Sequence, residues 1–147
     1  MMCIALLVFA VVAMGAVLGA DPRANLVPRD YQNTTCVLTD DMSLGGANAD
    51  AVLEAIHQLA NNTNKCSADP GLDNCKSLYC SRHSSVKLCN DNTTKITVDC
   101  SDLATYVWTV KYDCSLKVPG SNWNGTWGRA TDSNGFFVAV EGDSDCV

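Results

Sequence analysis

Two stretches of the chain carry apolar residues at helical spacing. In the first, residues 48–61, they recur every three or four positions and form one face: Ala49, Val52, Leu53, Ile56, Leu59 and Ala60. Asn48 is of a type that caps helix starts, and Asn61 and Asn62 are of a type at which helices end. The pattern predicts an α-helix over residues 48–61.

The second helical stretch has a cysteine at each end. Intervals of three and four place five residues on one face: Cys100, Leu103, Val107, Val110 and Cys114. Asp99 or Ser101 is suited to cap this helix. The helix would hold its two cysteines about 21 Å apart, whereas a disulfide needs Cα atoms within roughly 7 Å. The two cysteines therefore cannot pair with each other.

Alternating apolar and polar residues predict short strands between and after the helices. SLYC (77–80) and SVKLCN (85–90) flank the turn SRHS, and Ile96 and Val98 alternate just before the second helix. In SVKLCN, the valine and leucine would face one side of the sheet, while the lysine and cysteine face the other. WGRAT and FFVAV are separated by DSNG, whose Asn-Gly pair favours a tight turn.

The order of these elements predicts an α+β fold. A strand–helix–strand–strand–helix–strand layout gives two helices packed on one small antiparallel sheet, an α/β sandwich of the split βαβ type.

The chain divides into a leader, a tail and a domain. Residues 1–20 are uncharged, almost wholly apolar and end in small residues before Asp21, which is typical of a secretory signal peptide; a membrane anchor is the alternative. Residues 21–35 have two prolines and no periodicity, so a flexible tail is predicted, with an entering strand left open near Cys36. Residues 36–147 form a single disulfide-rich domain.

Eight cysteines remain once Cys3 leaves with the leader. An even number in a small secreted domain predicts four disulfides, for which 105 pairings exist. Excluding a bridge between the two ends of the second helix leaves 90 of them. The eight are Cys36, Cys66, Cys75, Cys80, Cys89, Cys100, Cys114 and Cys146.

Charge and sequons bear on location and partners. The net charge is −6 and no basic cluster is visible, which argues against nucleic acid or an anionic membrane as partner. Four N-x-S/T sequons accompany the leader, and together they predict a glycosylated protein that is secreted to the extracellular space. We also expect a monomer without stable membrane insertion. They begin at Asn33, Asn61, Asn92 and Asn124.

Several of these segments together resemble a known family. An Ala-rich helix after GG, a strand ending in VKLCNDN, a Cys-capped helix ending in YDC and the segment GRATDSNGFFVAV follow one another over about residues 44–147. This succession is similar to the small cysteine-rich secreted proteins of filamentous fungi, many of which are candidate effectors. The order of elements also resembles the killer-toxin fold of smut-fungus viruses.

The killer-toxin resemblance implies an α/β sandwich, and the likeness to candidate effectors implies a virulence-related role. That toxin blocks calcium channels and relies on basic surface chemistry. This chain is acidic and has no lysine that matches the toxin's functional one, so the resemblance implies the fold and leaves the activity open.

Catalysis is not predicted from the side chains available. His57 and His83 are the only groups that titrate near neutrality without perturbation, and only Glu54 and Glu141 are available beside them as glutamates. The set lacks the context of a fungal-type ribonuclease. No G-x-S-x-G motif occurs, and an even set of cysteines in an oxidising compartment leaves no obvious free thiol.

No metal or other cofactor is predicted either. Cys80, His83 and Cys89 are ligand types that zinc accepts, but disulfides account for the cysteines. The oxygen-rich stretches 90–92 and 132–135 lack the distal glutamate of a calcium loop. Turns explain both stretches more simply.

Trp123 and Trp127 flank a Gly/Asn loop and are the candidate binding residues. They are suited to stack on a sugar or to anchor a protein partner; the alternative is that they complete the core. The leading hypothesis is an effector-like or toxin-like protein that binds an extracellular host or competitor protein. The rival hypothesis is a cell-wall carbohydrate-binding protein that uses these tryptophans.

Overall fold

The computed structural model describes residues 30–37, 46–72, 74–117 and 124–147. Two helices occur in these residues, α1 (Ala49–Ala60) and α2 (Cys100–Cys114). The strands are β1 (Tyr31–Cys36), β2 (Ala47–Asn48), β3 (Lys65–Ala68), β4 (Cys75–Ser81), β5 (Ser84–Asn90), β6 (Ile96–Asp99), β7 (Ser115–Lys117), β8 (Asn124–Thr126), β9 (Gly128–Asp132) and β10 (Phe136–Gly142).

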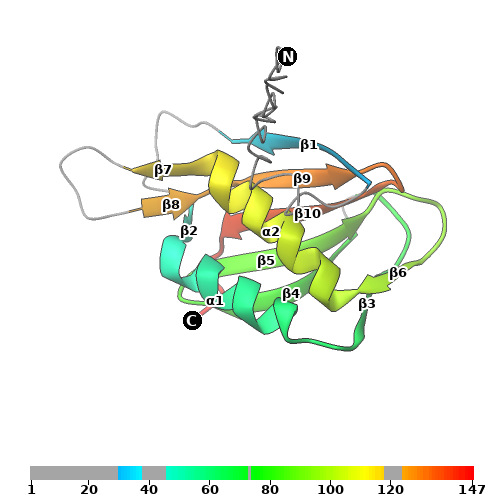
Figure 1. The fold of residues 1–147 in the computed structure, drawn as a ribbon, viewed down its shortest axis with the longest axis horizontal. Helices are drawn as coiled ribbons and strands as arrows, with labels where there is room; N and C mark the ends of the chain where they lie inside the picture. Colours follow the sequence, from blue (N-terminus) through cyan, green and yellow to red (C-terminus); the bar gives the residue numbers. More distant parts are fainter. Residues whose placement is uncertain (1–29, 38–45, 73, 118–123) are drawn as a thin grey trace, which may run out of the picture.

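The strands form one large sheet and two small ones. The large sheet has five strands in the order β1-β9-β10-β5-β4, each pair antiparallel. The three-stranded sheet β2-β8-β7 and the ribbon β3-β6 lie at opposite ends of it (Figure 1). Both helices lie side by side across one face of the large sheet (Figure 1). The fold is therefore a small α+β domain.

The two predicted helices are confirmed. The Asn48 side chain caps α1 by accepting hydrogen bonds from the backbone nitrogens of Asp50 and Ala51, at 2.9 and 3.2 Å. Helix α2 runs from Cys100 to Cys114, and Asp99 is its N-cap residue, although its side chain makes no capping hydrogen bond.

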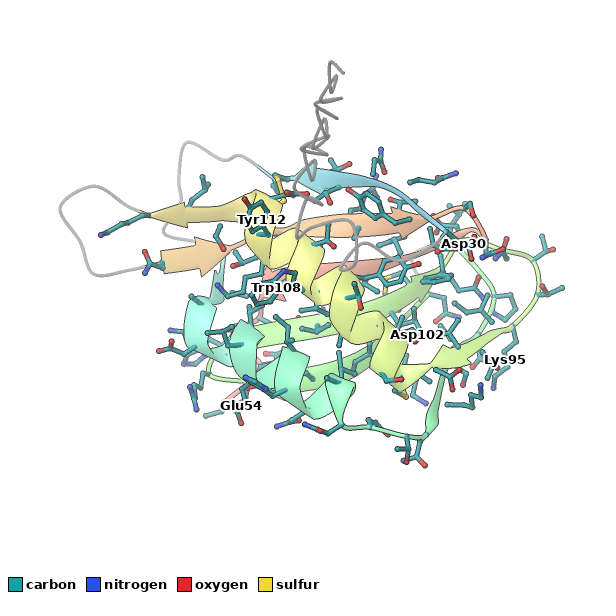
Figure 2. The ribbon with its side chains drawn as sticks, viewed as in Figure 1. Asp30, Glu54, Lys95, Asp102, Trp108 and Tyr112 are labelled. Carbon is teal, nitrogen blue, oxygen red and sulfur yellow. A yellow bond between two sulfur atoms is a disulfide. The ribbon has the colours of Figure 1, made fainter. Side chains whose placement is uncertain are left out.

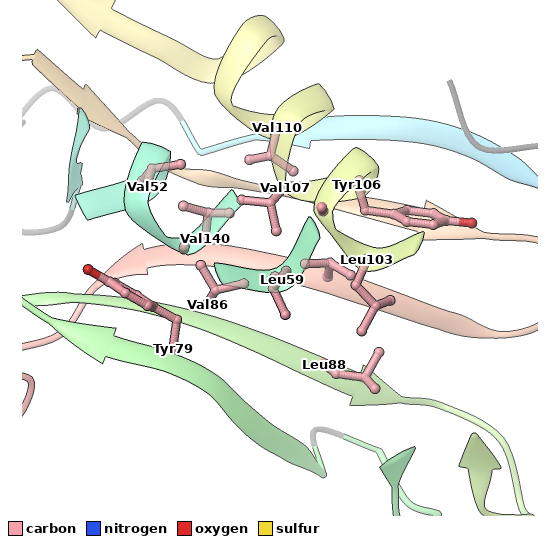
Figure 3. Packing of buried hydrophobic residues seen from close by; sticks show 14 of the residues in the cluster. Val52, Leu59, Tyr79, Val86, Leu88, Leu103, Tyr106, Val107, Val110 and Val140 are labelled. Carbon is pink, nitrogen blue, oxygen red and sulfur yellow. The ribbon is translucent and has the colours of Figure 1, made fainter. Parts of the chain in front are cut away.

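The core lies between the helices and the large sheet. The apolar stripe of α2 packs on alternate residues of β5 and β10, and α1 adds Val52 and Leu59 to the same core (Figure 3). The largest buried apolar side chains are Val52, Val86, Leu88, Leu103, Val107, Val110, Val138 and Val140. Each contributes about 1.5–3 kcal/mol relative to exposure, so this layer supplies most of the favourable free energy of folding.

Four disulfides tie the outer elements to this core. Cys66–Cys100 fixes the start of α2 to β3, and Cys36–Cys114 fixes its end to β1. The ends of α2 thus pair with other elements, which confirms that they do not pair with each other. The other two bridges are Cys75–Cys89, between β4 and β5, and Cys80–Cys146.

Gly128 makes room for one of these bridges. A Cβ atom at this position would lie 2.7 Å from the Cys114 sulfur and 2.8 Å from the Thr35 carbonyl oxygen. Only glycine allows β9 to pass this closely beneath the Cys36–Cys114 bridge.

The structure corrects three predictions. Residues 31–35, expected in a flexible tail, belong to β1 and pair with β9. Residues 65–68, where the sequence pattern predicts no strand, form β3. The strands form three sheets where one was expected, because strands of two to four residues pair outside the main sheet. The leader 1–20 lies outside the described residues.

The turn between β4 and β5 has an unusual backbone. Arg82 and His83 have φ values of 51° and 56°, in the left-handed region that favours glycine. Backbone hydrogen bonds join His83 to Cys146 and to Asp143, and the Arg82 side chain pairs with Glu54 of α1 at 2.9 Å. Contacts on both sides hold this turn in place despite its backbone cost.

Glycine and alanine variants at His83 measure the free-energy cost of its left-handed backbone. We expect His83→Gly to be more stable than His83→Ala by roughly 0.5–1 kcal/mol, because glycine avoids the left-handed strain but has more unfolded-state entropy. At Ser81, within β4, the order should reverse. Urea unfolding of the four oxidised variants tests this, and equal stability of the two His83 variants would contradict it.

Candidate functional site

The face of the large sheet opposite the helices carries a second set of side chains. Along β10, Phe136, Val138 and Val140 point into the core, so Phe137 and Glu141 project to the opposite face. The same alternation on β5 confirms the prediction that the lysine and cysteine of SVKLCN face away from its valine and leucine. The open face therefore combines residues of five strands.

A groove of about 400 Å³ lies on this face. Its lining residues come from β1, β4, β5, β9, β10 and the segments next to them: Thr35, Val37, Cys75, Lys87, Cys89, Trp127, Gly128, Arg129, Phe137, Ala139 and Glu141. The volume falls in the range of about 300–1,000 Å³ typical of small-ligand sites.

Arg129 and Phe137 form a pair in this groove. The guanidinium carbon of Arg129 lies 5.2 Å from the centre of the Phe137 ring, within the range of a cation–π interaction. Phe137 is only 8% exposed, whereas Arg129 is exposed. The ring therefore supports a guanidinium that remains accessible to solvent.

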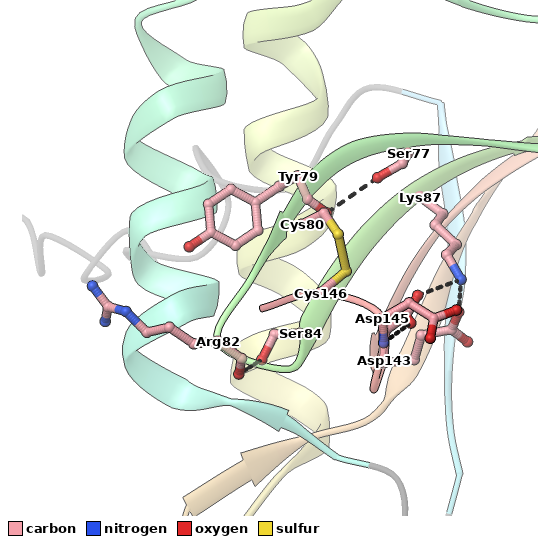
Figure 4. The surroundings of a disulfide bond; sticks show 10 residues. Ser77, Tyr79, Cys80, Arg82, Ser84, Lys87, Asp143, Asp145 and Cys146 are labelled. Carbon is pink, nitrogen blue, oxygen red and sulfur yellow. Dashed lines mark hydrogen bonds and ion pairs between the residues drawn. A yellow bond between two sulfur atoms is a disulfide. The ribbon is translucent and has the colours of Figure 1, made fainter.

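Lys87 is the centre of an ion-pair network in the same groove. Its Nζ lies 2.5 Å from Glu141 Oε1 and 3.2 Å from Asp143 Oδ2 (Figure 4). The hydrogen bond to Glu141 and the contacts to Asp143 raise the pKa of Lys87. The pKa of Asp143 is lowered, first by the hydrogen bond from the Asp145 backbone nitrogen and then by Lys87. Lys87 is thus charged and matched by two carboxylates.

Of the two candidate tryptophans, the structure describes Trp127. Trp127 is half-buried, lies outside the core cluster and lines the groove, and its carbonyl accepts a hydrogen bond from the Val37 backbone nitrogen at 3.1 Å. Trp123 lies outside the described residues. Trp127 therefore stays a candidate binding residue.

The residues considered for catalysis or metal binding are spread over the molecule. His57 lies exposed on α1 and His83 lies exposed in the β4–β5 turn. Cys80 and Cys89 are in disulfides, so neither is a thiolate ligand. Within the described ranges, no group of three or more His, Cys, Asp or Glu side chains is placed to hold a metal ion.

The Asx-rich stretch after β5 is a turn, as predicted. The buried Asn90 side chain donates to the carbonyls of Ala68 and Thr94 and accepts from the Asn92 backbone nitrogen at 3.0 Å. Its hydrogen bonds are thus used to connect β5 with the β3–β6 ribbon.

The four sequon asparagines differ in their surroundings. Asn33 and Asn124 are exposed on β1 and β8, and Asn61 is exposed while its side chain donates to the His57 carbonyl. Asn92 is half-buried and its Nδ2 donates to the Asn134 carbonyl at 2.6 Å. The Asn92 amide therefore connects two turns.

The helical side presents a different surface. Trp108 and Tyr112 project from α2 (Figure 2), and Trp108 is 38% exposed. Ile56, Ala104, Thr105 and Trp108 line a shallow hollow of about 250 Å³. This hollow is nearly all apolar, and it lacks the charged groups found in the groove.

Comparisons with known proteins give no relative. No protein-family model matches the chain, and neither a curated protein nor a solved structure matches it. In the part of the chain that the structure describes, no helix is long and apolar enough to cross a membrane. The four disulfides suggest an oxidising, extracellular-type environment.

The pKa of Asp143 predicts a pH dependence. Because it is lowered from 3.8 in the folded state, its stabilising effect is present above that pH and is lost as pH falls through the folded value. We expect Lys87→Met to lose less stability than the wild type between about pH 4 and pH 2. Urea midpoints across this range measure it.

The matched control is Lys65→Met, which removes an exposed ion pair with Asp99. It should keep the pH dependence of the wild type. Parallel curves for Lys87→Met and the wild type would contradict the assignment of the network.

Asn92 is expected to matter for stability more than the exposed sequon asparagines. Asn92→Gln should destabilise the glycan-free protein by about 1 kcal/mol, because the hydrogen bond to Asn134 is lost. The Asn92 amide also packs closely against Gly135, since a Cβ atom added there would lie 2.4 Å from Asn92 Oδ1. Asn33→Gln should change stability by less than about 0.5 kcal/mol; equal urea midpoints would refute the distinction.

Proposed function

We propose that the protein is secreted and acts outside the producing cell as an effector-like or toxin-like binding protein. The observation that carries this proposal is the groove on the open sheet face, where Trp127, Arg129 and Phe137 occur together. Tryptophan and arginine are enriched among residues that dominate protein-binding energy. The target is a surface protein of a host or competitor.

The disulfide frame supports an extracellular role. Bridges at both ends of α2, between β4 and β5, and at Cys146 each stabilise by about 2–4 kcal/mol in a chain of this size. Such a frame suits a protein that meets proteases and changing pH outside the cell. It also presents the groove residues from a rigid sheet, which lowers the entropic cost of binding.

The proposed likeness to the killer-toxin α/β sandwich has support from the layout. Both described helices lie on one face of an antiparallel five-stranded sheet, and the connections run from strand through helix to strand. The activity of that toxin is not proposed here, because the chain has a net charge of −6. A target that binds strongly basic surfaces does not fit this protein.

A second candidate is binding of cell-wall carbohydrate. The observation in its favour is that Trp127 lines a groove of small-ligand size, with the hydroxyl-bearing Thr35 and the carboxylate-bearing Glu141 on the same lining. Aromatic rings pack against sugar rings while such polar groups bond to hydroxyls.

Binding to intact cells distinguishes the two candidates. The labelled, fully oxidised protein should bind saturably to fungal cells or plant tissue, because the proposed target is exposed there. Pretreating the cells with protease should abolish binding, while mild periodate oxidation of glycans should leave it. Loss with periodate alone would favour the carbohydrate candidate.

Surface variants identify the face that binds. Arg129→Glu should weaken binding tenfold or more, because it reverses a central charge. Trp108→Ala, on the helical side, is the matched control and should bind like the wild type. No binding to either cell type, with no growth or tissue response, would overturn the proposed function.

A further inference from the structure

Lys87 and Arg129 are the two cations on the groove lining, and they differ in their partners. Lys87 pairs with carboxylates, as Lys65, Arg82 and Lys95 do elsewhere on the protein. Arg129 pairs with no carboxylate among the described residues, although the protein has more acidic than basic side chains. Its guanidinium lies over the face of the Phe137 ring.

This contact prepares the guanidinium for a ligand. An arginine that lies over an aromatic ring is partly ordered and keeps the forked edge of its guanidinium for hydrogen bonding. That edge matches the two oxygens of a carboxylate. Because less side-chain freedom is left to lose, a carboxylate binds here at a lower entropic cost than at a free surface arginine.

The charges around the groove point to the same ligand chemistry. Lys87 is already paired with Glu141 and Asp143, so Arg129 is the cation of the lining that has no carboxylate partner among the described residues. The net charge of −6 repels anions at a distance, but at physiological salt this repulsion is screened beyond about 8 Å. At contact, the nearest charge decides, and that charge is positive.

The volume of the groove and its other lining residues indicate which type of carboxylate-bearing ligand fits. A groove of about 400 Å³ holds a small ligand, whereas a protein interface spreads over an area of about 800 Å² per partner. The half-buried indole of Trp127 offers an apolar surface to a ring, and Thr35 offers a hydroxyl. A sugar ring that carries a carboxylate has all the matching groups.

We propose that this groove binds a uronic-acid unit of an acidic oligosaccharide. The Arg129 guanidinium takes the carboxylate, and the Trp127 indole packs against the sugar ring. The inference rests on the second candidate function, carbohydrate binding, and names the class of sugar. It does not depend on whether the protein target of the leading proposal also binds this face.

The test uses isothermal titration of the full-length oxidised protein with α-1,4-linked trigalacturonate. The neutral probe is its fully methyl-esterified form, which has the same rings and no charge. We expect trigalacturonate to bind at least tenfold more tightly than the ester, because a charged hydrogen-bonded pair is lost with the ester. Equal affinity for the acid and the ester, or no binding of the acid at millimolar concentration, would overturn the proposal.

Variants assign the contacts. Arg129→Gln should lower affinity for the acid about tenfold or more and leave affinity for the ester unchanged. Lys117→Gln changes the net charge equally from an exposed site outside the groove lining, and should bind the acid like the wild type. A loss of similar size in both variants would mean that only overall charge matters, and would also overturn the proposal.

Two further arms separate the sugar from other carboxylates. Trp127→Ala, once near-ultraviolet circular dichroism shows that it is folded, should lose binding of both acid and ester. Trp127→Phe should retain part of it and serves if the alanine variant does not fold. If a triglutamate peptide binds as tightly as the sugar and both Trp127 variants bind the sugar normally, the groove is a general carboxylate site and the sugar assignment fails.

The outcome is separate from that of the leading proposed function. Binding to cells that is lost with protease and kept after periodate supports the protein target even if trigalacturonate fails. Binding of trigalacturonate supports the groove assignment even if cells show no response.

Discussion

The arrangement of this protein depends on the attachment of α2 at both of its ends. Cys66–Cys100 joins its start to β3 and Cys36–Cys114 joins its end to β1, across 34 and 78 residues of sequence. Closing such loops in the unfolded chain removes entropy that folding would otherwise cost. The helix is thereby held across the sheet, and its apolar stripe must face β5 and β10. The absence of a Cβ at Gly128 is part of the same constraint, because β9 passes directly under one bridge.

Fixing both helices on one face gives the two faces of the sheet different roles. Alternate residues of β5 and β10 supply the core, and the residues between them face outward. The outward set is therefore not selected by packing against α1 or α2. It contains Lys87 of β5 and Glu141 of β10, and Arg129 lies on the same face on β9. Strand alternation thus separates the core residues from the residues of the proposed binding groove along the same segments. Groove residues presented by a rigid sheet keep their positions better than residues on loops.

The spacing of apolar residues was sufficient to predict the elements that bury a regular apolar face. Both helices and the β4–β5 and β9–β10 hairpins follow from residues spaced by three or four, or by two. The polar edge strand β1 was only left open near Cys36, and residues 31–35 were assigned to a tail, because the segment YQNTTC has no apolar alternation and follows two prolines. The strands β2, β3, β7 and β8 were not predicted, because a strand of two to four residues is too short to show a periodic pattern. Their pairing is set by tertiary contacts and by the disulfides.

The groove was only partly predictable, for a related physical reason. Alternation places Lys87 opposite to Val86 and Leu88, so its face could be predicted, but alternation says nothing of the neighbouring strands. Register supplies that information: Ala139 of β10 lies opposite both Lys87 and Arg129, and Thr35 lies opposite Arg129. Residues of β1, β5, β9 and β10 therefore meet at one place. Lys87 pairs with two carboxylates there, whereas Arg129 lies over the Phe137 ring. Because of this difference, Arg129 is the side chain that we propose to bind an anion.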